Sequence, residues 1–342
     1  MAALEIGAHS VRLSDRATAL LPGVAPAYTT RRGAAYRGDA LDLLRAMPDE
    51  SVNLVITSPP YALEFKKEYG NEPQNTYVEW FLPFAREVLR VLRPDGSFVV
   101  NVGGAWQKGH PVRSLYHFRL LLELVDTVGF FLAQEIYWHN PAKMPTPAEW
   151  VNVQRIRVKA SVEPCWWLSK TERPKASNLG VLVAYSDDML RLIDRGFRAK
   201  RRPSGHLAKA TWQKDLGGAI PGNVLTMGNN DSNGRYIAML TARGLKVHPA
   251  RFPVHLPGWF IRFLTEPGDI VVDIFGGSMT TGWAAERLDR AWLGFELSEE
   301  YVEASRLRFY DDDSRLLDDA LLGPAQKTVP GDIGGQLTLR DA

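Results

Sequence analysis

The sequence predicts an α/β protein whose parallel sheet is covered by helices on both faces. Short apolar runs of strand length alternate with segments in which apolar residues recur every three or four positions. One series of this kind extends over residues 35–138 and a second over residues 256–309. Strands that alternate with helices are typical of a parallel sheet with helices packed on both sides.

The first series contains the strands and helices of one half of the expected sheet. A strand at 35–39 ends at Asp39, and the turn Arg93-Pro94-Asp95-Gly96 stops the longest helix. The expected elements are strands 35–39, 52–56, 97–102 and 130–138, and helices 40–47, 77–92 and 117–128.

The second series supplies the rest of the sheet, and an irregular region separates the two. Residues 140–245 are rich in Gly, Pro and Asn, with a strand at 162–168 and a short helix at 185–195. Long loops inside compact enzymes are usually functional. The later elements are helices 257–265, 280–288 and 299–309 and strands 270–274 and 292–295. We therefore expect an arm rather than a core element at 1–34, core halves at 35–139 and 246–309, a recognition region at 140–245, and an acidic, mobile tail at 310–342.

Composition favours an ordinary globular protein. The 342 residues are 45% hydrophobic and 23% charged, without a signal peptide pattern or an apolar stretch of membrane length, so we expect a cytoplasmic protein. One cysteine, Cys165, excludes an internal disulfide and a Cys-rich zinc site. It directly precedes Trp166-Trp167-Leu168 inside an apolar strand, so burial is expected rather than nucleophilic chemistry. The seven histidines have no metal-ligand spacing, and no metal is inferred.

The charge is unevenly distributed. From Arg155 to Lys214 the sequence has 14 basic and 5 acidic residues, whereas residues 311–342 hold 3 basic and 7 acidic ones. A basic tract suits a phosphate backbone, because neutralised phosphates release counterions, but such runs are also common on solvated faces. Side chains expected to follow phosphates and bases are Arg198, Lys200, Arg201, Arg202, Trp212 and Tyr236.

Thr57-Ser58-Pro59-Pro60-Tyr61 follows the apolar strand 52–56. Ligands bind outside the carboxyl ends of parallel strands, so these residues fall where chemistry is expected. The two prolines fix φ and remove donors, which leaves the Ser58 hydroxyl and nearby carbonyls as a rigid row of acceptors. Such a row suits an exocyclic amine, and Tyr61 adds an aromatic face for a base lifted out of a duplex. The same residues by themselves also fit an ordinary turn.

Phe275-Gly276-Gly277-Ser278 connects a strand to the helix that starts at Thr280. The glycines let a ligand approach the backbone, the helix N-terminus favours an anionic group, and an acidic residue about 20 positions on binds ribose hydroxyls. Glu296 follows Gly276 by 20 positions, and Asp273 is placed to order the turn. The pattern fits a dinucleotide or S-adenosylmethionine, and also a merely tight connection.

Thr57-Ser58-Pro59-Pro60-Tyr61 resembles the catalytic motif of the amino-methyltransferases of DNA, and serine in its first variable position is typical of the cytosine-N4 branch. Further blocks between Arg32 and Phe309 are similar to the PvuII-type modification methyltransferases. They are residues 62–71, 150–152, 202–206 and 248–253.

This resemblance implies the S-adenosylmethionine-dependent methyltransferase fold. That fold has a mostly parallel seven-stranded sheet, here with a circularly permuted motif order and an inserted target-recognition region. The implied cofactor is S-adenosyl-L-methionine, with Glu296 on the ribose and Asp39 near the adenine. The residues implied near its methionine part and in the adjoining turn are Phe275, Gly276, Gly277, Ser278 and Thr280.

The resemblance also implies a reaction and a substrate. Ser58 Oγ and the Pro59 carbonyl would accept the hydrogens of a cytosine amine in double-stranded DNA, with Pro60 stiffening the edge and Tyr61 stacking on the base. Asn101 would polarise Ser58 or cap its loop. The expected DNA contacts are Lys66, Lys67, Lys200, Arg201, Arg202, Ser204 and His206.

The recognition sequence that the resemblance implies is CAGCTG. A companion restriction endonuclease is expected in the same system, and the protein is expected to be a monomer or a weak dimer. Two other functions stay open at this stage. One is adenine-N6 methylation, because the same fold and motif serve either amine. The other, from a different class, is DNA binding without catalysis by a vestigial methyltransferase core.

Overall fold

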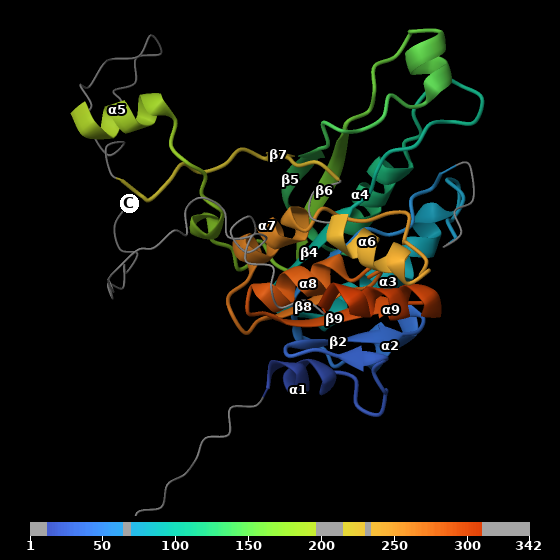
Figure 1. Cartoon of the computed structure of the whole chain (residues 1–342), viewed down its shortest axis with the longest axis vertical. Coiled ribbons are helices and arrows are strands. Elements are labelled where there is room, and N and C mark those ends of the chain that lie inside the picture. The colour runs from blue at the N-terminus through green and yellow to red at the C-terminus, as the bar shows by residue number, and fades with distance from the viewer. Residues whose placement is uncertain (1–11, 64–69, 196–214, 230–233, 310–342) are drawn as a thin grey trace, which may run out of the picture. The chain divides into compact units, whose positions relative to one another are not determined.

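The computed structural model describes residues 12–63, 70–195, 215–229 and 234–309 (Figure 1). These residues divide into two compact units. One contains the residues up to Gly180 and from Gly222 onward, and holds the sheet. The other is Val181–Pro221, in which α5 (Asp187–Arg195) follows a bridge between Val183 and Ala219. None of the described helices is long and apolar enough to cross a lipid bilayer.

The described part of the sheet has nine strands in the order β1-β2-β9-β8-β3-β4-β6-β5-β7. Strand β6 runs antiparallel to β4 and β5, β1 runs antiparallel to β2, and the other pairs are parallel, so the mostly parallel sheet is confirmed. The strands are β1 Tyr28–Thr29, β2 Gly33–Arg37, β3 Val52–Thr57, β4 Leu92–Asn101, β5 Phe131–His139, β6 Val162–Ser169, β7 Val224–Thr226, β8 Ile270–Asp273 and β9 Ala291–Glu296.

The expected strand number is corrected from seven to nine, because the short strands β1 and β7 lie at the two edges of the sheet. Strands of two and three residues are too short to produce a periodic apolar pattern. The seven remaining strands lie where strands were predicted, but β4 begins at Leu92 and so includes residues 93–96, which were predicted as a turn. The pairing with β3 is irregular there, since Val52 pairs with Leu92 and Leu54 with Ser97.

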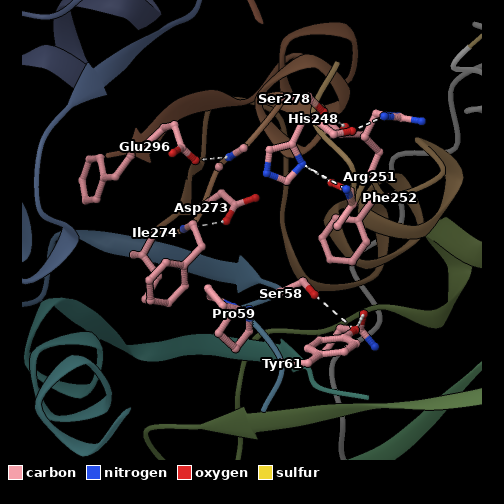
Figure 2. Close-up of a pocket in the computed structure, with 18 of the residues that line it drawn as sticks. Ser58, Pro59, Tyr61, His248, Arg251, Phe252, Asp273, Ile274, Ser278 and Glu296 are labelled. Carbon is pink, nitrogen blue, oxygen red and sulfur yellow. Dashed lines mark hydrogen bonds between the residues drawn. The ribbon is translucent and has the colours of Figure 1, made fainter. Parts of the chain in front are cut away.

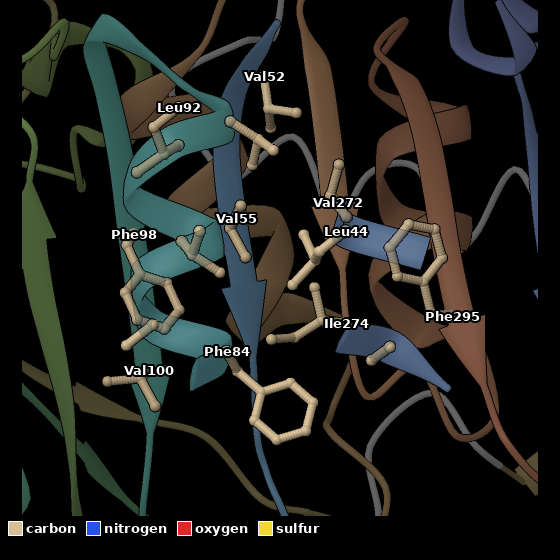
Figure 3. Close-up of a cluster of buried hydrophobic side chains, with 14 of the residues drawn as sticks. Leu44, Val52, Val55, Phe84, Leu92, Phe98, Val100, Val272, Ile274 and Phe295 are labelled. Atoms are coloured by element: carbon tan, nitrogen blue, oxygen red, sulfur yellow. The ribbon is translucent and has the colours of Figure 1, made fainter. Parts of the chain in front are cut away.

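Helices cover both faces of the sheet. On one face Leu44 of α2 and Phe84 of α3 pack against the strands in a single apolar core (Figure 3). Since successive side chains of a strand alternate, Leu54 of β3 points to the opposite face, where α7 contacts β3 and packs against α8. The helices of this unit are α1 Leu13–Thr18, α2 Ala40–Ala46, α3 Tyr77–Val91, α4 Tyr116–Asp126, α6 Gly234–Ala242, α7 His255–Leu264, α8 Thr280–Arg287 and α9 Glu299–Ser305, with shorter turns η1 Glu149–Val153, η2 Asn178–Val181 and η4 Arg306–Phe309.

Two predictions about the chain outside the main pattern are wrong. The expected arm contains α1, whose Ala17 joins Leu21 in the core, because a helix of six residues is too short to show clear periodicity. Tyr236, expected to contact bases, is buried in α6, and the Arg308 guanidinium lies 4.1 Å from the centre of its ring. A third difference lies within the main pattern, because the helix expected over 299–309 changes to a 3-10 turn after Ser305.

The sheet has a switch point between β3 and β8. These strands are parallel neighbours, with Leu54 opposite Val271 and Val55 opposite Val272. The chain leaves β3 through α3 toward β4 on one side, and leaves β8 through α8 toward β9 on the other. Open α/β sheets bind ligands in the crevice at such a point. Ser58 and the glycine turn after Asp273 therefore meet at the same crevice.

Candidate active site

A cavity of about 430 Å³ lies at this crevice and is lined by both predicted half-sites. Figure 2 shows Ser58, Pro59 and Tyr61 on one side, with Asp273 and Glu296 toward the other. The lining includes every predicted catalytic residue and every predicted cofactor residue. These are Asp39, Ser58, Pro59, Pro60, Tyr61, Asp273, Phe275, Gly276, Gly277, Ser278, Thr280 and Glu296.

Asp273 ties the two half-sites together. Its buried carboxylate accepts hydrogen bonds from the Thr57 hydroxyl at 2.7 Å, the Thr281 hydroxyl at 2.6 Å and the Phe275 backbone N–H at 3.1 Å. Burial raises the pKa of Asp273, and the three hydrogen bonds oppose that rise. Because Thr57 directly precedes Ser58, the glycine turn and the catalytic edge share one anchor.

The glycine turn needs small residues and is held by Glu296. Gly277 has a φ of +52°, and a Cβ on Gly276 would lie 2.7 Å from Met279 Sδ and 3.2 Å from the Phe295 carbonyl oxygen. One Glu296 oxygen accepts from the Gly277 N–H at 2.9 Å, and the other accepts from the Ser298 N–H at 2.8 Å. Burial raises the pKa of Glu296.

An aromatic wall closes the cavity beside the turn. The Phe275 ring packs against Trp80 and Phe84 of α3, with ring centroids 5.9 and 5.3 Å apart. Asp39 caps α2 by accepting from the Leu41 N–H at 2.8 Å, and it lines the same cavity. The cofactor half thus combines an apolar wall with three carboxylates, those of Asp273 at the end of β8, Glu296 at the end of β9 and Asp39 at the start of α2.

A buried cation supports the turn from behind. Arg308 donates to the Ser278 carbonyl at 2.7 Å and to the Ser278 hydroxyl at 2.9 Å. Burial lowers its pKa to about 10. Arg251 and His248 add basic groups to the cavity wall, and Arg251 donates to the His248 carbonyl.

The catalytic half centres on the Tyr61 hydroxyl. Ser58 Oγ donates to it at 3.3 Å, and it lies 2.9 Å from Asn101 Oδ1 and 2.8 Å from Glu163 Oε2. Lys143 forms an ion pair with the other oxygen of Glu163. Burial first, and the nearby Glu163 charge second, hold the pKa of Tyr61 well above its usual value of 10. Asn101 contacts Tyr61, and its amide also donates to the Pro164 carbonyl at 3.0 Å.

The sequence analysis missed Glu163 and Lys143. Glu163 is a carboxylate inside an otherwise apolar strand, which is costly unless the charge is paired, and this was the available signal. Its partner stands 20 positions earlier in an irregular loop, where no pattern marks it. Other unpredicted residues of the cavity wall include Trp80, Phe84, Trp138, Asn140 and Ile274, whereas Arg251 belongs to the block 248–253 that carried the family resemblance.

Cys165 is buried in β6, where burial raises its pKa, in agreement with the expected core role. The described residues contain no group of three His, Cys, Asp or Glu side chains arranged to hold a metal ion. The predicted DNA contacts lie outside the described residues. They are Lys66, Lys67, Lys200, Arg201, Arg202, Ser204 and His206, together with Arg198 and Trp212.

A crevice of this kind, with a glycine turn and the Glu296 carboxylate beside a rigid Ser-Pro-Pro-Tyr edge, is typical of α/β enzymes that bind a nucleotide-like cofactor. Comparison with known proteins gives the family. The DNA methylase family model N6_N4_Mtase matches residues 52–307, and the chain belongs to this family.

Individual relatives agree with this family. The chain is 56% identical over 292 residues to the type II methyltransferase M.PvuII of Proteus hauseri, covering 84% of this chain and 87% of the relative. It is 28% identical over 273 residues to M.BglII of Bacillus subtilis, covering 78% and 66% of the two chains. A solved structure described as PvuII DNA methyltransferase (cytosine-N4-specific) superposes with a TM-score of 0.70 at 49% identity, covering 88% of this chain and 94% of that one.

Proposed function

We propose that the protein is a sequence-specific DNA methyltransferase that transfers a methyl group from S-adenosyl-L-methionine to N4 of a cytosine flipped out of duplex DNA. The observation that carries this proposal is the single cavity that joins the Ser-Pro-Pro-Tyr edge to the glycine turn. The relative at 56% identity is a type II methyltransferase, and the superposed structure is described as cytosine-N4-specific. Both fit a role in restriction-modification.

The cofactor half fits S-adenosylmethionine. Gly276, Gly277 and Glu296 line the cavity together, and the close approach of Met279 and the Phe295 carbonyl to Gly276 leaves no room for a side chain in this turn, so its backbone borders the cavity beside the Glu296 carboxylate. In this proposal Glu296 binds the ribose hydroxyls and Asp39 lies near the adenine. The turn residues that face the methionine part are Phe275, Gly276, Gly277, Ser278 and Thr280. When bound, the cofactor supplies an electrophilic methyl group on its sulfonium.

The catalytic half prepares the amine. A nucleobase amine is a poor nucleophile because its lone pair is delocalised into the ring. Ser58 Oγ and the Pro59 carbonyl accept its hydrogens in a geometry that favours a pyramidal nitrogen, while the Tyr61 ring stacks on the base. Holding the nitrogen in line with the methyl supplies a proximity term of up to about 7 to 11 kcal/mol in favourable models. Lifting the base out of the duplex costs a few kcal/mol, which contacts to the extruded base must offset.

The protein's substrate is double-stranded DNA, with CAGCTG as the proposed site, and its location is the cytoplasm. A companion restriction endonuclease acts on the same sequence without direct contact to this chain. The enzyme works as a monomer or weak dimer. The basic tract that includes Lys200, Arg201 and Arg202 supplies phosphate contacts.

Mass spectrometry of nucleosides from methylated DNA tests the function. We expect the product to be N4-methylcytosine. Ser58→Ala should give at least tenfold less of it, because Ser58 Oγ accepts a hydrogen bond from the amine. Cys165→Ala should give as much as the unmodified protein, because Cys165 is buried and takes no part in the reaction. Formation of N6-methyladenine would make the protein an adenine methyltransferase. Absence of any methylated base would favour a DNA-binding protein without catalysis, and modified-base sequencing of the same DNA would read the recognition site.

A further inference from the structure

We propose that Glu163 is the final acceptor of the proton released during methyl transfer and that the proton reaches it through Ser58 and Tyr61. This inference rests on the proposed function. The geometry points to it because the three side chains form one hydrogen-bonded chain from the catalytic edge into the protein. Ser58 donates to the Tyr61 hydroxyl at 3.3 Å, and Tyr61 donates to Glu163 Oε2 at 2.8 Å.

The reaction requires such an acceptor. The amine nitrogen forms a bond to the methyl carbon, the carbon–sulfur bond breaks, and its electron pair stays on sulfur. The nitrogen then carries two hydrogens and a positive charge, so one proton has to leave. That proton passes to Ser58 Oγ, the serine proton passes to the Tyr61 oxygen, and the tyrosine proton passes to Glu163. The products are a neutral N-methyl amine, a thioether and a protonated Glu163.

Neither hydroxyl is able to keep the proton or to lose one permanently. A serine hydroxyl is a weak base, and burial holds the pKa of Tyr61 well above 10, so a lasting tyrosinate is unfavourable. Both groups are therefore suited to receive one proton while releasing another. Glu163 is the carboxylate in contact with this chain, and its residue is only 9% exposed.

Lys143 and Asn101 fit the two states of the relay. Lys143 forms an ion pair with Glu163 Oε1, and this leaves Glu163 Oε2 for Tyr61. A tyrosine hydroxyl has one proton but lies within hydrogen-bond distance of two acceptors, Glu163 and Asn101 Oδ1. After the transfer, protonated Glu163 donates to the tyrosine oxygen, and the tyrosine's new proton turns to Asn101.

The titratable surroundings of Glu163 come from several elements. Lys143 stands in the loop between β5 and β6, Tyr61 follows β3, Tyr116 begins α4, and Cys165 lies two residues further along β6. Lys143 is the cation that pairs with Glu163. Burial, to which the Glu163 charge adds, raises the pKa of Tyr61, Tyr116 and Cys165, so these three groups stay protonated.

The test compares Glu163→Gln with Tyr61→Phe in single-turnover methylation of duplex DNA. Glutamine keeps an oxygen for the Tyr61 hydroxyl and cannot take the proton, whereas phenylalanine keeps the stacking face and breaks the relay. We expect each variant to slow the methyl-transfer step about 100-fold, as for loss of a general base, with unchanged affinity for S-adenosylmethionine and DNA. The double variant should be no slower than either single one, because both interrupt the same path.

The dependence on pH separates a relay from a merely structural role. In the unmodified protein the rate should fall at low pH, where a carboxylate acceptor can no longer take a proton, and Glu163→Gln should lose this acid limb. Glu163→Asp, which restores a carboxylate, should regain part of the rate and the acid limb. Glu79→Gln, a matched change at an exposed carboxylate of α3, should retain both the rate and the pH profile.

Three results would overturn the relay. The first is a normal rate in Glu163→Gln. The second is a slow Glu163→Gln that keeps the acid limb or loses affinity for DNA, which indicates positioning of Tyr61 instead. The third is additive loss in the double variant. If the unmodified protein yields no methylated base at all, the proposed function itself fails, and the relay fails with it.

Discussion

Glu296 is the residue whose carboxylate lies between the glycine turn and the cavity. Its two oxygens accept from the backbone of Gly277 and Ser298, and burial raises its pKa. Glu296→Ala should weaken S-adenosylmethionine binding about tenfold to a hundredfold, since a hydrogen bond to a charged group is worth roughly 1.5 to 3 kcal/mol. Isothermal titration calorimetry measures this affinity directly.

A neighbouring glutamate provides the control for this change. Glu299 forms an exposed ion pair with Arg37 at 2.8 Å, and pairs of that kind contribute little. Glu299→Ala should therefore bind the cofactor as the unmodified protein does. Equal affinity in the two variants would contradict the assignment of the ribose site to Glu296.

At the scale of elements, the end of β4 shapes the catalytic edge through Gly103. A Cβ added there would lie 2.4 Å from Tyr61 Cε2, closer than any ordinary contact. The Tyr61 ring has little freedom to move aside, because its hydroxyl is within hydrogen-bond distance of Ser58, Asn101 and Glu163. The loop after β4 and the turn after β3 are therefore built to fit each other.

Gly103→Ala should lower the rate of methylation at least tenfold, because it displaces Tyr61, while S-adenosylmethionine affinity stays within about twofold. Rate and affinity are measured by single-turnover methylation and by calorimetry. Gly222→Ala is the control, since a Cβ at Gly222 meets no atom within 4 Å. A normal rate in Gly103→Ala would show that the edge tolerates a moved tyrosine.

At the scale of the whole molecule, His117 links stability to pH. It is buried on α4, and burial together with the Arg113 charge lowers its pKa from 6.5 to about 4. The unfolded chain binds the proton more readily, so stability is present above pH 6.5 and is lost as pH falls toward 4. A pKa of about 4 in place of 6.5 corresponds to roughly 3 kcal/mol in the free energy of unfolding between neutral and acidic pH.

Urea denaturation at pH 7 and pH 4.5 tests this linkage. The unmodified protein should lose more stability between the two values than His117→Leu, because leucine cannot be protonated. His248, whose pKa is also lowered to about 4, remains in both proteins and contributes equally. An identical loss in both proteins would assign the acid sensitivity to other groups.

DNA binding also belongs to the whole molecule, because it sums over many phosphates. Replacing Lys200, Arg201 and Arg202 together with Ala should weaken DNA binding and reduce the salt slope of log K by about 3 if each contacts a phosphate. Fluorescence anisotropy at several salt concentrations measures that slope. An unchanged affinity and slope would make the tract a solvated surface.

The local features of this protein were predictable from its sequence. Apolar runs and helical spacing located β3 and α3 to within one residue at each end. The motif that begins at Ser58 and the turn at Gly276 were recognisable because proline and glycine restrict or free the backbone at the positions they occupy. Both motifs follow strands of a sheet predicted to be parallel, and the carboxyl ends of parallel strands, where ligands bind, lie at one edge of the sheet.

The tertiary structure alone decided which side chains complete the site. Tyr61 meets partners 40 and 102 positions away, and Glu163 is held by a lysine from an irregular loop. Such contacts join positions that share no periodicity, so no local pattern contains them. The burial of Tyr236 and of the α1 core residues has the same origin, because a short helix becomes part of a core only through the surfaces that pack against it.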